Sequence, residues 1–244
     1  MQLTNNTILI TGGTSGIGLA LALEFKKRDN TVIICGRRQE RLDEIAVKHP
    51  GIITHTCDVA DEQQREELVQ WLVTNYPDTN VLVNNAGIQL ITDLTKPADL
   101  KRVRSEIETN LVAPIHLSSL LATHLSVKNG AAIINISSGL AFAPLAFMPV
   151  YCATKAAIHS VSLSLRHQLK DTHVKVFEIA PPAVDTELGH DRREDKNQSH
   201  GGMPVDEFIT GAIDALQNDN YEAAIGQAGQ LREKRELLFD MMNN

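Results

Sequence analysis

The chain has 244 residues, of which 43% are hydrophobic but only 4% aromatic, so aliphatic residues and alanine must build most of its core. This length suits one large α/β domain or two small ones. A formal net charge of −7, from 23 basic and 30 acidic residues without a basic stripe, argues against a nucleic-acid-binding protein.

Short apolar runs alternate along the chain with longer amphipathic segments. The apolar runs predict strands at residues 7–10, 31–35, 52–57, 81–83, 131–136, 174–179 and 222–225. The amphipathic segments predict helices at residues 16–28, 39–48, 61–75, 100–126, 150–170 and 205–217. Nearly continuous apolar strands are typical of parallel sheets that are covered on both faces.

This alternation predicts the α/β class. We expect one Rossmann-like domain over residues 1–244, with a doubly wound parallel sheet of about seven strands and helices on both faces. The polar, glycine-containing stretch 189–203 is predicted to be a mobile loop near the substrate.

A glycine-rich turn follows the first predicted strand and leads into a helix, with the sequence Thr-Gly-Gly-Thr-Ser-Gly-Ile-Gly at residues 11–18. Gly12 allows a tight turn, Gly16 lets a pyrophosphate approach the backbone, and Gly18 lets the helix pack on the strand. No Gly-Lys-Ser/Thr follows, which disfavours an NTPase. The alternative is an ordinary glycine-rich turn, but its position at the first strand favours a dinucleotide site.

Arg37 and Arg38 follow the second predicted strand. A carboxylate at this point would bind the adenosine ribose hydroxyls and repel a 2′-phosphate, whereas an arginine can bind that phosphate through two hydrogen bonds. The pair therefore favours NADP(H), with NAD(H) still possible. The alternative is a surface arginine pair at the start of a helix.

Tyr151 and Lys155 lie four residues apart on a predicted helix, so both side chains lie on one face. A nearby ammonium lowers the pKa of a phenol, which suits an acid/base catalyst. Ser138 follows the fifth predicted strand, where its hydroxyl can donate to a carbonyl oxygen. Taken alone, the Tyr–Lys spacing is common by chance, and Ser138 could be a turn residue.

Together these motifs resemble the short-chain dehydrogenase/reductase family over essentially the whole chain. They stand in the family's order: the glycine turn, Asn-Asn-Ala-Gly at residues 84–87, Asn110, Ser138, and Tyr151 with Lys155. Residues 138–142 and 149–159 resemble a narrower subgroup, the DltE-like oxidoreductases. The resemblance implies an oxidoreductase that moves a hydride between a nicotinamide and a carbonyl/alcohol pair.

The resemblance also implies a role for each residue. Tyr151 transfers the proton, Lys155 lowers its pKa and binds the nicotinamide ribose, Ser138 polarises the substrate oxygen, and Asn110 holds a water linked to Lys155. The expected cofactor-binding residues are Gly12, Thr14, Ser15, Gly16, Ile17, Gly18, Arg37, Arg38, Asp58, Val59, Asn85, Ala86, Gly87, Tyr151, Lys155, Pro181, Val184 and Thr186. Substrate contacts are expected from Ser138, Leu140, Phe142 and Tyr151.

The sequence departs from the family pattern after the sixth predicted strand. The family usually has Pro-Gly there, whereas this chain has Pro181-Pro182. A second proline fixes φ and removes an N–H group, so the loop that binds the nicotinamide carboxamide could run differently, and a cis peptide bond is possible. Val184 and Thr186 still fall where the family makes that contact.

The remaining expectations concern partners and location. The resemblance implies a homodimer or homotetramer that acts on a small carbonyl/alcohol substrate, and the alternative is a catalytically silent NADP(H)-binding redox sensor. The nine histidines show no metal-binding spacing, so no metal is expected. Three scattered cysteines, no signal peptide pattern, and no apolar run near the roughly 18 residues of a membrane span predict a cytoplasmic protein without a membrane partner.

Overall fold

The computed structural model describes residues 1–188 and 201–244. Seven strands form one sheet in the order β3-β2-β1-β4-β5-β6-β7, and every neighbouring pair is parallel. The strands are β1 (Thr7–Thr11), β2 (Thr31–Gly36), β3 (Ile52–Thr56), β4 (Thr79–Asn84), β5 (Ala132–Ile136), β6 (Lys175–Ala180) and β7 (Glu222–Ala224). The strand order reverses between β1 and β4, which is where a doubly wound sheet binds its ligand.

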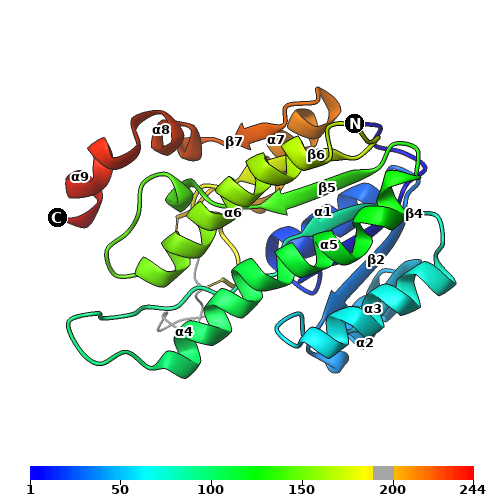
Figure 1. Cartoon of the computed structure of the whole chain (residues 1–244), viewed down its shortest axis with the longest axis horizontal. Coiled ribbons are helices and arrows are strands. Elements are labelled where there is room, and N and C mark those ends of the chain that lie inside the picture. The colour runs from blue at the N-terminus through cyan, green and yellow to red at the C-terminus, as the bar shows by residue number, and fades with distance from the viewer. Residues whose placement is uncertain (189–200) are drawn as a thin grey trace.

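Helices cover both faces of this sheet, because alternate residues of each strand point to opposite sides. Ile8 and Ile10 of β1 face a core shared with α1 (Gly16–Lys26), α2 (Gln39–Lys48) and α7 (Val205–Gln217). Leu9 faces the opposite core, which includes residues of α3 (Glu62–Asn75), α5 (Ala113–Ser126) and α6 (Pro149–Gln168). Figure 1 shows α5 and α6 lying along one face of the sheet. The predicted doubly wound parallel fold is confirmed.

The predicted helix 100–126 differs in detail from the observed segment. It is divided into α4 (Leu100–Ile107), a π-helical turn η1 (Glu108–Val112) and α5. Pro114 stands in the first turn of α5 and cannot donate to the carbonyl of Asn110, four residues earlier. A π-helical turn accommodates such a break in the α-helical ladder and is frequent at functional sites.

The C-terminal part of the chain contains helices that the sequence analysis did not predict. These are α8 (Gln227–Lys234), a 3₁₀ turn η4 (Arg235–Leu238) and α9 (Phe239–Asn243). Figure 1 shows α8 and α9 extending beyond the end of β7. No described helix combines the length and the apolar character that a membrane span requires. Of the predicted mobile loop, residues 189–200 lie outside the described residues.

Candidate active site

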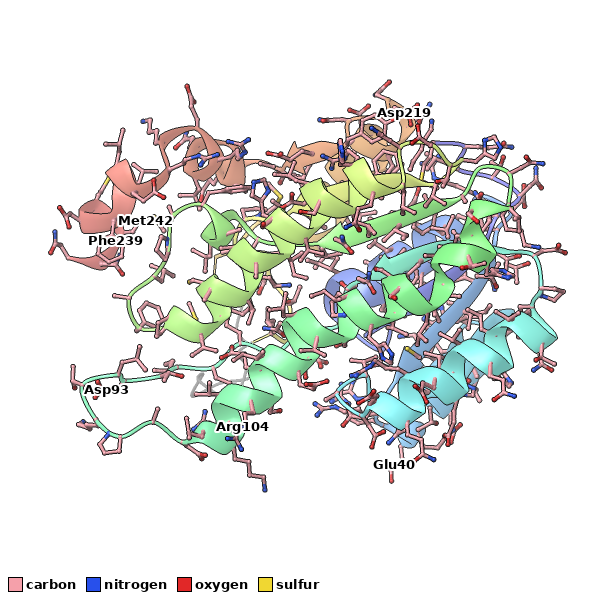
Figure 2. All side chains as sticks on the ribbon, in the orientation of Figure 1. Glu40, Asp93, Arg104, Asp219, Phe239 and Met242 are labelled. Carbon is pink, nitrogen blue, oxygen red and sulfur yellow. The ribbon has the colours of Figure 1, made fainter. Side chains whose placement is uncertain are left out.

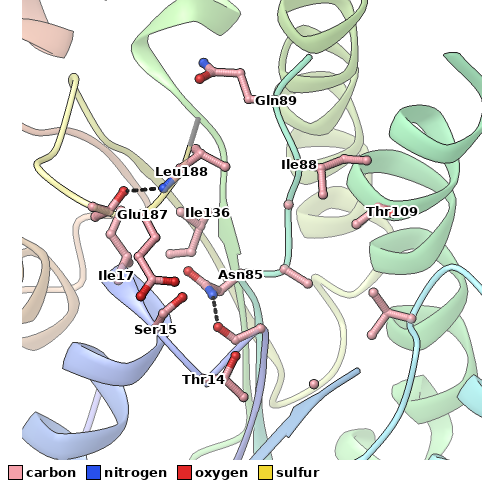
Figure 3. A pocket seen from close by; sticks show the side chains of 18 of the residues that line it. Thr14, Ser15, Ile17, Asn85, Ile88, Gln89, Thr109, Ile136, Glu187 and Leu188 are labelled. Atoms are coloured by element: carbon pink, nitrogen blue, oxygen red, sulfur yellow. Dashed lines mark hydrogen bonds between the residues drawn. The ribbon is translucent and has the colours of Figure 1, made fainter. Parts of the chain in front are cut away.

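A cleft of about 490 Å³ opens at the carboxyl ends of β1, β2, β4 and β5. Figure 3 looks into it, with Thr14 and Ser15 on one side and Ile88 and Thr109 on the other. Most residues that the sequence assigned to the site line this cleft: Gly12, Thr14, Ser15, Gly16, Ile17, Gly18, Arg37, Arg38, Asp58, Val59, Asn85, Ala86, Gly87, Tyr151, Lys155, Pro181 and Thr186.

The glycine turn forms the end of the cleft next to α1. Gly12 and Gly16 both have positive φ, +65° and +53°, a conformation that favours glycine. A Cβ atom on Gly12 would lie 2.8 Å from the Cα of Ala86, so the backbone of β1 and the loop after β4 meet there. Ser15 precedes α1 without a side-chain capping bond. The first amides of α1 therefore border a cleft where an anionic group can accept their hydrogen bonds.

Thr11 and Asn85 connect this turn to the end of β4. The hydroxyl of Thr11 accepts hydrogen bonds from the backbone N–H groups of Asn85 and Ala86, both at 3.1 Å. The side-chain amide of Asn85 donates in return to the carbonyls of Thr11, at 2.9 Å, and Gly12, at 3.1 Å. These bonds fix the relative position of the two loops that form the floor of the cleft.

Arg37 and Arg38 lie at the end of the cleft beyond β2, and the side chains of both are more than half exposed. Arg37 lies 3.9 Å from a carboxylate oxygen of Asp58, and Arg38 lies 3.9 Å from one of Glu187. These separations exceed hydrogen-bonding distance. Both guanidinium groups can therefore bind an anion at this end of the cleft without breaking a close ion pair.

Tyr151 and Lys155 face the cleft from successive turns of α6, and each is only 5% exposed. The Lys155 ammonium donates to the carbonyl of Ile136 at 2.8 Å and lies 5.7 Å from the centre of the Tyr151 ring. Burial lowers the pKa of Lys155 to about 8, whereas the negative charge of Glu178 raises it. At neutral pH Lys155 therefore carries its proton beside the tyrosine.

Asn110 lies in the π-helical turn and binds the segment that follows Gly87. Its amide oxygen accepts from the N–H of Ile88, and its amide nitrogen donates to the carbonyl of the same residue, both at 2.8 Å. It also donates to the hydroxyl of Thr154 at 3.2 Å. A Cβ atom on Gly87 would lie 3.5 Å from Asn110 Oδ1 and 3.8 Å from Lys155 Nζ, so both side chains border this glycine.

The three residues after β5 that the sequence assigned to substrate contacts lie in different surroundings. Ser138 is buried, and its hydroxyl accepts from the N–H of Leu140 at 3.1 Å. Leu140 packs against a small apolar cluster that includes Tyr151. Phe142 is also buried, but its ring meets His159 edge-on at 5.0 Å and Arg232 at 5.2 Å. Among the described residues, the lining of the cleft includes none of these three.

The segment after β6 returns to the glycine turn despite its two prolines. Pro181 and Thr186 line the cleft, and a Cβ atom on Gly16 would lie 3.2 Å from the Cβ of Thr186. Val184 is buried and forms a parallel bridge with Met203, outside the cleft lining. Every peptide bond in the described residues is trans, so the possible cis bond is not formed.

The cleft also includes residues that the sequence analysis did not single out. They are Gly36, Cys57, Gln89, Leu90, Thr109, Ile136, Ser137 and Glu187. Leu90 is held by Glu106, whose carboxylate accepts from its N–H at 2.9 Å one helical turn before Asn110. Two residues of one helical segment thus hold the chain from Ile88 to Leu90 along the cleft. The i, i+4 spacing of Glu106 and Asn110 was a signal for this shared face.

The C-terminal helices contact the loop that follows Ser138. Asn243 accepts from the N–H of Ala146 at 2.6 Å and donates to the carbonyl of Pro144 at 3.1 Å. A Cβ atom on Gly139 would lie 2.9 Å from a side-chain carbon of Leu231 in α8. Figure 2 shows Phe239 and Met242 at the same end of the molecule as Asp93, in the loop after β4.

A model of the short chain dehydrogenase family matches residues 6–197. The chain belongs to the short-chain dehydrogenase family. It is 48% identical over its full length to the uncharacterized oxidoreductase DltE of Bacillus subtilis (strain 168), and the match covers 98% of that relative. The resemblance to this family, and to its DltE-like members, is confirmed.

Two solved structures show the same fold. One is a short chain dehydrogenase from Burkholderia cenocepacia J2315 in complex with NADP, with a TM-score of 0.82 and 23% identity. The match covers 96% of this chain and 94% of that protein. The other is a short-chain dehydrogenase from Sphingobium yanoikuyae in complex with NADPH, with a TM-score of 0.78 and 27% identity. That match covers 89% of this chain and 86% of the other protein. The first supports the fold alone, and the second is a relative with a bound nicotinamide dinucleotide.

Proposed function

We propose that this short-chain dehydrogenase is an NADP(H)-dependent oxidoreductase that moves a hydride between the nicotinamide and a small carbonyl/alcohol substrate. The observation that carries the proposal is the position of Tyr151 and Lys155. Both line the cleft that begins at the glycine turn, on adjacent turns of α6. A proton-transferring group therefore borders the same cavity as a binding site for a dinucleotide.

The residues of the cleft fit a dinucleotide. Gly12 and Gly16 leave room beside the backbone, and the uncapped start of α1 offers N–H groups to a pyrophosphate. Asp58 and Val59 would bind the adenine, while Pro181, Val184 and Thr186 would hold the nicotinamide end. Arg37 and Arg38 would bind a 2′-phosphate, which favours NADP(H) over NAD(H). The NADPH complex of the relative from Sphingobium yanoikuyae supports the same preference.

Proton transfer is assigned to the hydroxyl of Tyr151. In the reductive direction this hydroxyl donates its proton to the carbonyl oxygen as the alcohol forms, and in the oxidative direction the phenolate takes the proton back. The ammonium of Lys155 favours the phenolate and so keeps the tyrosine able to exchange a proton near neutral pH. When bound, the nicotinamide cofactor supplies or accepts the hydride.

Ser138 and Asn110 complete the proposed catalytic set. The Ser138 hydroxyl would donate to the substrate oxygen, and its bond from Leu140 uses a lone pair and leaves the hydroxyl proton available. Asn110 holds Ile88 against the cleft and would hold a water linked to Lys155. Leu140 and Phe142 would form the apolar side of the substrate site, Phe142 by supporting the loop from behind. The homodimer or homotetramer implied by the family stays a prediction.

The test is turnover of NADPH with a panel of aldehydes and ketones, and of NADP⁺ with alcohols. Tyr151→Phe should retain NADPH binding but lose about 10²-fold or more in kcat, because the acid/base group is removed. Tyr221→Phe, outside the cleft lining, is the matched control and should retain full activity. NADPH binding without turnover of any substrate would support a redox sensor, and unchanged turnover in Tyr151→Phe would disprove the proposed chemistry.

A further inference from the structure

Four ionisable side chains from four elements meet below the loop that follows β5. We call His159 of α6, Glu178 of β6, Glu222 of β7 and Arg232 of α8 the charged cluster. His159 Nδ1 lies 2.7 Å from a carboxylate oxygen of Glu178, and Arg232 forms an ion pair with Glu222. Ligand atoms of His159, Glu178 and Glu222 lie within 4.8 Å of one another. The cluster therefore concentrates charge beside the helix that carries Tyr151.

The charged cluster is better described as an ion network than as a cation site. Arg232 already neutralises Glu222, and its fixed positive charge opposes the entry of a divalent cation. Glu178 is completely buried, and within the described residues its second carboxylate oxygen has no hydrogen-bond partner. His159 is half-buried and holds the other oxygen. A buried carboxylate with one partner acts over a longer range than a solvated one, because little water screens it.

The cluster is aligned with the catalytic pair. Tyr151, Lys155 and His159 occupy positions i, i+4 and i+8 of α6, so their side chains lie along one face of the helix. On the sheet, Glu178 is the register partner of Asn135, which directly precedes the residue whose carbonyl binds Lys155. The hydrogen bond to that carbonyl leaves the charge of Lys155 without neutralisation. Glu178 supplies a negative charge whose effect on Lys155 opposes the effect of burial.

We propose that Glu178 is a positioning residue whose negative charge keeps Lys155 in its ammonium form, with His159 orienting the carboxylate. This inference rests on the proposed function of the Tyr151–Lys155 pair. Glu222 and Arg232 largely cancel each other and affect Lys155 less. Arg166 of α6 donates hydrogen bonds to the carbonyls of Val176 and Tyr221. These bonds fix its positive charge beside those two carbonyls.

The experiment is an NMR titration of the lysine side chains, with the Lys155 signal assigned by its loss in Lys155→Met. In Glu178→Gln, Lys155 should lose its proton at lower pH, with about a tenfold loss of proton affinity. Glu178→Asp retains the charge and should restore most of that affinity. Glu222→Gln is the matched control, because it removes a carboxylate that Arg232 already neutralises, and it should move the titration much less.

Activity gives a second readout. The alkaline limit of the pH–rate profile should move to lower pH in Glu178→Gln and return toward the parent value in Glu178→Asp. If Glu178→Gln does not fold, a double variant with His159→Gln replaces the histidine–carboxylate pair by a neutral amide pair and serves the same comparison. An unchanged Lys155 titration in a folded variant overturns the inference. The NMR signal needs no substrate, so this result is independent of whether the proposed oxidoreductase activity is found.

Discussion

The ammonium of Lys155 donates a hydrogen bond of 2.8 Å to the carbonyl oxygen of Ile136, in a site where only 5% of the lysine is exposed. Burial of this charge lowers the pKa of Lys155 to about 8. The unfolded chain holds the same proton up to a pKa of about 10.4. Between these values the unfolded state binds more protons than the folded state, so the contribution of Lys155 to stability improves as the pH rises.

Lys155→Met should therefore unfold less readily than the parent at pH 7. The difference between the two pKa values corresponds to about 3 kcal/mol as an upper estimate, part of which would be lost to imperfect packing of the methionine. The extra unfolding free energy of Lys155→Met over the parent should disappear as the pH rises from about 8 to about 10.5. Urea unfolding at pH 7 and pH 10 measures it, with the exposed Lys101→Met as the control. A less stable Lys155→Met at pH 7 contradicts this prediction.

Gly18→Ala should disturb both folding and cofactor binding. A Cβ atom at this position would lie 2.4 Å from Asn85 Nδ2 and 2.4 Å from the carbonyl oxygen of Gly12. The backbone oxygen cannot move aside as a flexible side chain could, so we expect a loss of about 1–3 kcal/mol in unfolding free energy. NADPH affinity should fall with it, because Asn85 holds the glycine turn.

The control for this substitution is Gly229→Ala in α8. Its Cβ atom would meet Ala224 O at 3.6 Å, an ordinary contact, and alanine favours a helix over glycine by about 0.5–1 kcal/mol. Chemical denaturation and NADPH titration of both variants make the comparison. Equal stability of Gly18→Ala and the parent would show that the turn tolerates a side chain.

Arg37 and Arg38 should determine the preference for NADPH. Replacing both by alanine removes the charged donors for a 2′-phosphate, so NADPH affinity should fall by about 10- to 100-fold while NADH affinity stays nearly unchanged. Fluorescence titration with each cofactor measures the ratio. Lys48→Ala, at the exposed end of α2, controls for a general change of surface charge. Equal losses for both cofactors would place the phosphate elsewhere.

Glu106→Gln should change the pH dependence of stability. Burial raises the pKa of Glu106, so the folded state binds its proton more tightly than the unfolded state. The resulting stability is present in acid and is lost as the pH rises through the raised pKa. Gln cannot ionise and can still accept a hydrogen bond from the N–H of Leu90. The unfolding free energy of the variant relative to the parent should therefore increase as the pH rises from about 4 to 7. Urea unfolding across this range tests it, and a constant difference would exclude the explanation.

The sequence predicted the sheet well, and most residues that it assigned to a cofactor line the cleft, because both the strands and the glycine turn depend on local patterns. Apolar runs specify buried parallel strands, and positions 12 and 16 require the positive φ that glycine favours. The π-helical turn at Asn110 was not predicted, since an amphipathic pattern does not register a single turn with a different hydrogen-bond spacing.

The C-terminal helices were not predicted for a different reason. The five residues of α9 are too few for a periodic signal, and Met241 is 72% exposed. Its contact with the loop after β5 comes from Asn243, through bonds that only tertiary structure can create. The sequence also showed no sign that Ser137 lines the cleft, because this depends on where β5 ends, which propensity leaves undetermined by a residue or two.

The hydrogen bonds of Asn243 to Pro144 and Ala146 matter for any redesign of this protein for new substrates. A mutational library restricted to the walls of the cleft would leave out α8 and α9, although these helices set the course of the loop behind Tyr151. Substitutions at Leu231 or Asn243 offer a way to widen or tilt that loop without touching a reacting atom. We therefore expect substrate selectivity to respond to changes in residues 227–243, far along the sequence from the glycine turn.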